Sequence, residues 1–373
     1  RGGAVAGERE PGPGRGRERM SKDAMERKPS IVDFVPGTKT DGTFLGHLTC
    51  GDIPKEGEPK TIESDLTPTM AFRALAESWV RASPVRKAGT QEIIGTLDLQ
   101  DACRYLVDLH SAAAANKVVQ GRKRRLSWIA EHPQVKAATD AGKGNIEELA
   151  MKRKFHTFKP SEPLAKVSAA LGAGSHIVGI VDEESGALIN IVTQGVLIRL
   201  LAPILKKLTI PVKQLMKSPV ISVKSEDTAS TAFEVISSKH ISGLAVLDED
   251  GGVVNNCTIT DVKMLISAQD DPTAEVSMVQ KVEDFLKYHR NLQASKMGKA
   301  KLPVAKCGKA DKLHQAVAKL VRTGYHHIWV VHEDVKAPLG VLSLTDVFKI
   351  LPSLDLEGSN AALKSRSKSC TIL

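Results

Sequence analysis

The sequence predicts an α/β (α+β) protein in which one strand–helix–strand–strand–helix unit occurs four times. Amphipathic helix patterns, each followed by a pair of short apolar strands, carry this prediction, because apolar residues at i, i+3 and i+4 mark a helix. A short polar step then leads from each strand pair into the next helix: Asp98–Asp101, Thr193–Val196, Thr258–Asp261 and Ser343–Asp346. The similar spacing of the first and third steps, and of the second and fourth, favours two halves of two units each.

The 373 residues carry a formal charge of +9, and only 4% of them are aromatic. A core of Ala, Val, Leu and Ile suits small packed units, and the positive charge favours anionic ligands, anionic lipid or nucleic acid. The cysteines are scattered and form no C-x-x-C pair, so we expect neither a disulfide framework nor a metal site, and a reducing, cytoplasmic setting fits them. They are Cys50, Cys103, Cys257, Cys307 and Cys370.

Residues 1–60 are rich in Gly, Pro and charged residues, and this composition predicts a disordered segment. Arg1–Arg19 contains no apolar stretch of the kind found in secretory signals, and we expect Met20 to be the natural start. The longest apolar run, Gly195–Leu205, contains Arg199 and is shorter than the roughly 20 apolar residues that cross a bilayer.

The first unit is predicted over residues 61–115, with a helix after Pro68 whose apolar face is Phe72, Leu75, Ala76 and Trp79. The second unit is predicted over 155–208, the third over 209–270, and the fourth, with its connecting helix, over 271–353. The strand pairs of these three units are His176–Val181 with Leu188–Val192, Gly243–Leu247 with Val253–Cys257, and Ile328–Val331 with Leu339–Leu342.

Residues 116–154 are interpreted as a basic linker, with ten Lys or Arg against four Asp or Glu. A solvated loop is one interpretation of this segment. A nuclear-targeting or kinase-recognised segment, with Ser127 after Arg124 and Arg125 as a phosphorylation site, is another. Nucleic-acid binding is disfavoured because the charge lies in one loop and no platform of several aromatic side chains, on which successive bases could stack, accompanies it.

The step Thr258–Asp261 supports two interpretations. The first is a capping box, in which the hydroxyl and the carboxylate satisfy backbone N–H groups at the start of a helix. The second is ligand binding, because a carboxylate there can accept hydrogen bonds from two ribose hydroxyls while the helix start favours a phosphate. The two roles are compatible, and the recurrence of the step in four units favours a role beyond capping.

The segments Ile241–Leu265 and His326–Leu351 resemble CBS repeats. Four such repeats resemble the two tandem CBS pairs, in a disc-like arrangement, of the gamma subunit of AMP-activated protein kinase and its yeast and plant relatives, over about Thr61–Pro352. The resemblance implies a non-enzymatic, energy-sensing regulatory subunit that binds AMP, ADP or ATP between paired repeats. It also implies that no cofactor is needed and that the partners are the catalytic and scaffold subunits of a protein kinase.

Three sets of residues match the family's ligand contacts, and the second step departs from the set because Val196 replaces its acid, as in the family's second repeat. The ribose contacts are Asp101, Thr258, Asp261, Ser343 and Asp346. The phosphate contacts are Arg81, His176 and His326. Further ligand contacts are Thr193 and Ser225. The alternatives are a solvated helix-end cation for the arginine and packing at strand starts for the two histidines.

Two departures from the family bear on affinity. Ile177 and His327 stand where the kinase subunit carries Arg, and neutral histidine lacks the permanent bidentate phosphate contact of Arg. Phosphate binding is therefore predicted to be weaker or pH-dependent. In the first step Asp98 replaces the hydroxyl, and a second carboxylate near a phosphate is unfavourable. We therefore rank the third and fourth steps above the first and expect two or three working sites.

Residues 354–373 end in a C-a-a-X pattern that starts at Cys370 and follows a basic run from Lys364 to Lys368, which predicts geranylgeranylation. One lipid chain with nearby basic residues supplies the two signals that peripheral membrane attachment requires. The alternative function is therefore a non-catalytic prenylated scaffold whose repeats bind a partner without sensing nucleotide. An enzyme is disfavoured, because the sequence shows no phosphate-binding loop, nucleophile elbow or zinc-protease motif.

Overall fold

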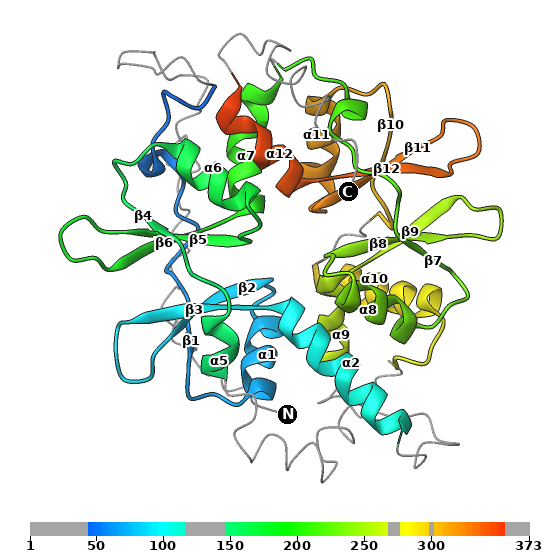
Figure 1. Cartoon of the computed structure of the whole chain (residues 1–373), viewed down its shortest axis with the longest axis horizontal. Helices are drawn as coiled ribbons and strands as arrows, with labels where there is room; N and C mark the ends of the chain where they lie inside the picture. Colours follow the sequence, from blue (N-terminus) through cyan, green and yellow to red (C-terminus); the bar gives the residue numbers. More distant parts are fainter. Residues whose placement is uncertain (1–43, 116–145, 207, 268–276, 298–301, 355–373) are drawn as a thin grey trace, which may run out of the picture. The chain divides into compact units, whose positions relative to one another are not determined.

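The computed structural model describes residues 44–115, 146–206, 208–267, 277–297 and 302–354, all of which lie in the compact unit Pro36–Leu373. These residues form four units of one topology (Figure 1). In every unit the first strand pairs in parallel with the second, and the second pairs antiparallel with the third. The predicted strand–helix–strand–strand–helix order is thus observed in each unit.

The strands are short and form small three-stranded sheets. Unit by unit they are β1 (Ile62–Glu63), β2 (Ala82–Arg86) and β3 (Ile93–Asp98); β4 (Thr157–Phe158), β5 (Ile177–Val181) and β6 (Leu188–Thr193); β7 (Ser222–Lys224), β8 (Gly243–Leu247) and β9 (Val253–Thr258); β10 (Lys306–Gly308), β11 (His327–Val331) and β12 (Pro338–Ser343).

Two helices accompany each sheet. They are α1 (Pro68–Glu77) and α2 (Leu99–Ala115); α6 (Leu164–Gly172) and α7 (Gln194–Leu205); α8 (Ala229–Ser238) and α9 (Val262–Ser267), the latter entered through η4 (Ile259–Asp261); α11 (Leu313–Thr323) and α12 (Leu344–Ile350). The described residues also form α5 (Ile146–Met151), α10 (Val282–Met297) and the single turns η2 (Cys50–Asp52), η3 (Val212–Gln214) and η5 (Leu351–Ser353). None of the described helices is long and apolar enough to cross a bilayer.

Local signals begin and end these helices. The first helix starts at Pro68, and the Thr67 hydroxyl accepts the Met70 N–H at 3.3 Å, an N-cap of the ordinary kind. Trp79 was expected on the apolar face of this helix, but it lies beyond the helix end with φ of 55° and is 44% exposed. The cause is local: α1 ends at Glu77, two residues before Trp79, so the helical periodicity no longer places the Trp79 ring on the apolar face.

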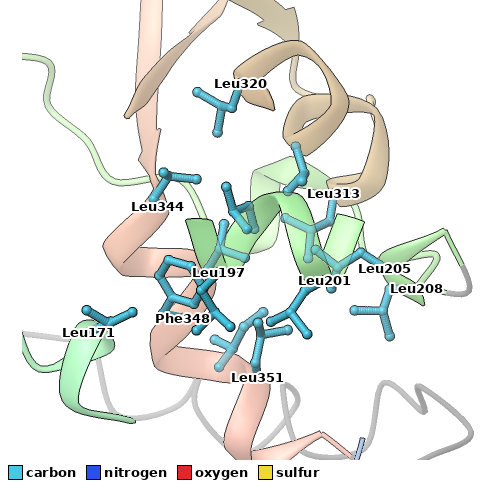
Figure 2. Close-up of a cluster of buried hydrophobic side chains, with 14 of the residues drawn as sticks. Leu171, Leu197, Leu201, Leu205, Leu208, Leu313, Leu320, Leu344, Phe348 and Leu351 are labelled. Carbon is cyan, nitrogen blue, oxygen red and sulfur yellow. The ribbon is translucent and has the colours of Figure 1, made fainter. Parts of the chain in front are cut away.

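Helices from alternate units pack together and form two separate cores. The first and third units share one core, in which α1 packs on α9 and α2 on α8. The second and fourth units share the other, in which α6 packs on α12 and α7 on α11 (Figure 2). Leu201 of α7, Leu313 of α11 and Phe348 of α12 are fully buried there, and each buried side chain of this size stabilises the fold by about 1.5–3 kcal/mol.

Sheets from consecutive units also pack together. Ala82, Phe155 and Ile177 form a small buried cluster between the first and second sheets. Ala245, Val253, Trp329 and Val331 form a matching cluster between the third and fourth. The two halves predicted from step spacing are therefore held together internally by their sheets and joined to each other by their helices.

Part of the segment predicted to be disordered is folded. Phe44, Leu45 and Leu48 are buried in the core of the second and fourth units, and the Phe44 N–H donates to the Leu354 carbonyl at 2.8 Å. The expectation for residues 1–60 is therefore wrong for this stretch, because a few closely spaced apolar side chains outweigh its polar composition. Residues 1–43 lie outside the described residues.

Two further boundaries differ from the predicted ones. The end of the predicted basic linker forms α5, and this helix packs on β3, where Gly95 allows its close approach. The connecting helix α10 was placed with the fourth unit, but Val282, Phe285 and Leu286 are buried in the core of the first and third units. Residues 116–145, including the predicted phosphorylation site at Ser127, lie outside the described residues.

Candidate functional site

All four polar steps cap the helix that follows. The Asp346 carboxylate accepts the Ser343 N–H at 3.0 Å and the Ser343 hydroxyl at 2.6 Å. The Asp261 carboxylate accepts the Thr258 N–H at 2.7 Å and the Thr258 hydroxyl at 2.8 Å. The Thr193 hydroxyl accepts the next-turn Val196 N–H. The capping interpretation is therefore confirmed, and any ligand role is additional to it.

In the first step Asp98 takes the place of the capping hydroxyl. The Gln100 N–H donates to Asp98 Oδ1 at 2.8 Å, and the Asp98 N–H donates to Asp101 Oδ2 at 3.1 Å. The carboxylate of Asp98 thus serves as a cap while its second oxygen points to other partners. The acid at the fourth position of the step keeps the same backbone contact as in the third and fourth steps.

Each of the three predicted ribose-binding acids faces a cation from another segment of this chain. Asp101 Oδ2 lies 2.5 Å from Arg153 Nη1, and Asp261 Oδ1 lies 2.8 Å from Arg290 Nη1. Asp346 Oδ1 lies 2.5 Å from the Nζ of a lysine in the loop before β7, Lys217. The sequence did not reveal these partners, since they approach through tertiary packing.

The three ion pairs differ in how far they are buried. Arg290 is 10% exposed and its carboxylate partner 1%, whereas Arg153 is 34% exposed and Lys217 67%. An exposed cation exchanges partners readily, because water solvates it while it moves, but a buried one does not. The first and fourth steps are therefore accessible to exchange, and the third is closed.

The third step is closed by two side chains of α10. His289 Nδ1 lies 2.5 Å from Asp261 Oδ1, which also receives Arg290. Burial alone would raise the pKa of Asp261, but the two basic groups outweigh burial and hold that pKa well below its usual range. Asp261 was expected to be an open ribose contact, and the structure shows that its carboxylate is already saturated by protein groups.

Two of the three predicted phosphate contacts converge on one buried carboxylate. His176 Nδ1 lies 2.7 Å from Asp98 Oδ2, and Arg81 Nε lies 3.5 Å from the same oxygen. Burial raises the pKa of Asp98, but Arg81 and His176 lower it below its usual range, so Asp98 is ionised. The negative charge expected from a ligand phosphate is thus supplied here by the protein.

The third predicted phosphate contact, His326, is half-buried, and its carbonyl accepts the Leu344 N–H at 2.9 Å. The next residue, His327, lies within electrostatic reach of Arg81 and His176. Its Nε2 lies 3.1 Å from the Ser242 hydroxyl. Burial first, and then the nearby Arg81, lower the pKa of His327 to about 4, so this imidazole is neutral at neutral pH.

A basic cavity of about 310 Å³ adjoins the first step. Its polar lining comes from Thr96 and Asp98 of β3, from Ser175 and His176 before β5, and from Arg153, Lys154 and His156 before β4. Arg153 both lines this cavity and pairs with Asp101, so it connects the predicted ribose contact with a space large enough for a small ligand. The step that the sequence ranked below the third is the one beside a cationic cavity.

A larger cavity of about 500 Å³ adjoins the second step, which has no acid. Thr193 lines it together with other polar side chains, with apolar ones such as Ile62 and Leu75, and with the charged side chains Glu56, Glu58 and Lys60. The predicted contact Thr193 therefore does face a cavity. Ser225, by contrast, is buried at the end of β7, where its N–H donates to the Leu247 carbonyl. The predicted lipidation site, Cys370, lies outside the described residues.

Comparison with known proteins identifies the architecture. The family model of the CBS domain matches residues 212–268 and 300–353, which are the third and fourth units. A crystal structure of protein MJ1225 from Methanocaldococcus jannaschii, described as a proposed archaeal homologue of γ-AMPK, superposes with a TM-score of 0.59 at 18% identity. That match covers 81% of this chain and 99% of the other. The chain has a CBS-like fold.

Several curated relatives of similar sequence are fungal. Protein SDS23 of Eremothecium gossypii is 26% identical over 318 residues, which cover 79% of this chain and 61% of the relative. Protein SDS24 of Saccharomyces cerevisiae is 24% identical over 352 residues, which cover 86% of this chain and 63% of the relative. The chain therefore spans about three fifths of the length of the curated relatives it matches.

Proposed function

We propose that this CBS-like chain is a non-catalytic regulatory protein that binds an adenine nucleotide, AMP, ADP or ATP, in the basic cavity beside its first step. The observation that carries the proposal is the cationic lining supplied by Arg153 and Lys154, beside the imidazoles of His156 and His176 and next to Asp101. Its volume of about 310 Å³ lies at the lower end of the range of ligand pockets.

Binding would proceed by exchange of partners at Arg153. A phosphate accepts a bidentate contact from the guanidinium, which frees the carboxylate of Asp101 to accept the ribose hydroxyls. Asp98 opposes the phosphate, but its charge is already matched by Arg81, and the imidazole of His176 lies within hydrogen-bond distance of the same oxygen. The cavity therefore offers the phosphate two cations, Arg153 and Lys154, that Asp98 does not hold.

Nucleotide binding can be relayed through α5. The Arg153 N–H donates to the Ala150 carbonyl at the end of α5, and the Arg153 carbonyl accepts the Thr96 N–H of β3 at 3.0 Å. A ligand that pulls on Arg153 therefore shifts the contact between this helix and the first sheet. Coupling free energies of this kind are typically about 1–3 kcal/mol.

The proposed partner is a protein kinase complex with catalytic and scaffold subunits. The likeness of the fold to a protein described as a proposed homologue of γ-AMPK supports this choice. The proposal predicts that partner capture from source cells changes when nucleotide is added. It also predicts that Asp101→Asn, which removes the proposed ribose acceptor, abolishes that change.

A second candidate is a scaffold that binds its partner without sensing nucleotide. The observation that favours it is that all three step acids are neutralised within the chain, so the fold needs no ligand charge to stabilise them. In this function a prenyl group on Cys370 would tether the chain to a membrane. Partner capture that ignores both nucleotide and Asp101→Asn would favour the scaffold, and mass spectrometry of the natural C-terminus would test the lipid.

Ligand titration tests the first candidate. AMP and ATP are expected to bind, and adenosine, which lacks a phosphate, is expected to bind at least about tenfold more weakly, since charge-assisted hydrogen bonds contribute about 1.5–3 kcal/mol. If none of the three binds at millimolar concentration, the proposal is overturned. Equal affinity for adenosine and AMP would show that the basic cavity does not receive the phosphate.

A further inference from the structure

The third step carries a feature that its capping role does not use. Asn256 of β9 is 1% exposed, and neither polar atom of its amide has a hydrogen-bond partner within the described part of the chain. Side chains alternate along a strand, so Asn256 and Thr258 lie on the same face of β9. A buried amide with both atoms unsatisfied is uncommon, and such groups occur where a ligand or water supplies the partners.

Arg290 extends along this same strand. Its Nη1 lies 2.8 Å from Asp261 Oδ1, and its Nη2 donates to the Asn256 carbonyl at 3.2 Å. The guanidinium also lies 5.8 Å from the centre of the Tyr325 ring of the fourth unit. Arg290 therefore bridges the proposed ribose acceptor and the strand residue that carries the unsatisfied amide.

We propose that the third step is a second nucleotide site held closed by Arg290, which occupies the site as an internal ligand. When α10 withdraws Arg290 and His289, the carboxylate of Asp261 becomes available for ribose hydroxyls and the Asn256 amide for the edge of an adenine base. An amide presents one donor and one acceptor, the pattern that an adenine edge complements. This inference rests on the proposed nucleotide-binding function and assigns that function a closed site and the residue that closes it.

Comparison with the first step supports the assignment. Arg153 and Arg290 hold equivalent carboxylates, but Arg153 is 34% exposed beside a cavity, whereas Arg290 is 10% exposed. The same kind of ion pair is therefore an exchangeable contact at the first step and a closure at the third. The number of nucleotides bound would then depend on the position of α10.

The experiment is calorimetric titration of the full chain with AMP, comparing wild type with Arg290→Gln. The variant removes the internal ligand and is expected to bind one more equivalent of AMP than wild type. If wild type already binds this equivalent weakly, the variant is expected to bind it at least about tenfold more tightly. Lys287→Gln is the matched control, because it removes a charge from the exposed side of the same helix and should leave the stoichiometry unchanged. A folded Arg290→Gln protein with wild-type stoichiometry and affinity would overturn the inference.

Two further variants keep the test decisive. Arg290→Lys retains the charge but cannot reach both Asp261 and the Asn256 carbonyl, so it serves if the glutamine variant does not fold. Asp261→Asn combined with Arg290→Gln removes the buried carboxylate together with the arginine that pairs with it. Because the proposed ribose acceptor is then lost, the stoichiometry should return to that of wild type. An additional AMP equivalent that survives in this double variant would overturn the assignment to Asp261.

The outcomes separate this inference from the proposed function. Wild-type binding that Arg290→Gln does not increase contradicts only the closed site. Binding by Arg290→Gln without any binding by wild type supports the closed site and contradicts the cavity at the first step. Absence of binding by both proteins contradicts both.

Discussion

Acidification should destabilise the fold through His327. The pKa of this histidine is lowered to about 4, first by burial and then by the charge of Arg81, while an unfolded histidine has a pKa of about 6.5. Between these two values the unfolded state binds more protons than the folded state, so stability falls as the pH drops. The full effect is about 3 kcal/mol, and between about pH 7 and about pH 5 the loss is about 2 kcal/mol.

The assay is urea denaturation of wild type and His327→Gln at both pH values. Glutamine keeps a hydrogen-bonding group near the Ser242 hydroxyl but does not titrate. The difference between the two proteins at about pH 7 measures the packing cost of the substitution, and its change on acidification measures the proton linkage. We expect the variant to lose about 2 kcal/mol less than wild type. Equal losses would refute the argument that His327 is neutral because it is half-buried and lies near the charge of Arg81.

Two further predictions concern the parts of the fold that the sequence did not reveal. Leu45→Ala should cost about 2–5 kcal/mol in urea denaturation, because Leu45 is fully buried in the core of the second and fourth units; a cost near zero would show that the stretch around it is not part of the fold. Gly95→Ala should cost about 2–3 kcal/mol and loosen α5, because its Cβ would lie 2.1 Å from the Ala150 carbonyl oxygen. Gly195→Ala, whose Cβ would meet only ordinary contacts at 3.6 Å, is the matched control, and equal effects of the two would contradict the close packing of α5.

The units and their steps could be predicted from sequence because their signals are local. A capping box needs residues three positions apart, so Thr258 with Asp261 and Ser343 with Asp346 could be recognised directly. Hydrophobic periodicity likewise marked the helices. It extended the first helix to Trp79, however, and the positive φ of Trp79 shows that the backbone is no longer helical there. Composition misjudged the stretch at Phe44–Leu48, since three apolar residues do not alter an average over sixty positions.

The state of each step could not be predicted, because it depends on contacts between distant segments. Arg153 and Arg290 lie 52 and 29 positions from the acids they bind, and no local pattern connects them. The sequence therefore ranked the steps by the residues within them and placed the third above the first. Packing reverses that order, since α10 closes the third step while the first adjoins a basic cavity.

The most direct test of the central claim is the affinity of the full chain for AMP with and without Arg153. Calorimetry on wild type, Arg153→Gln and the exposed control Arg199→Gln should give similar dissociation constants for wild type and control. The Arg153→Gln protein should bind at least about tenfold more weakly, since it loses a charge-assisted phosphate contact. Unchanged AMP affinity in folded Arg153→Gln would contradict the claim that the cavity beside the first step is the nucleotide site.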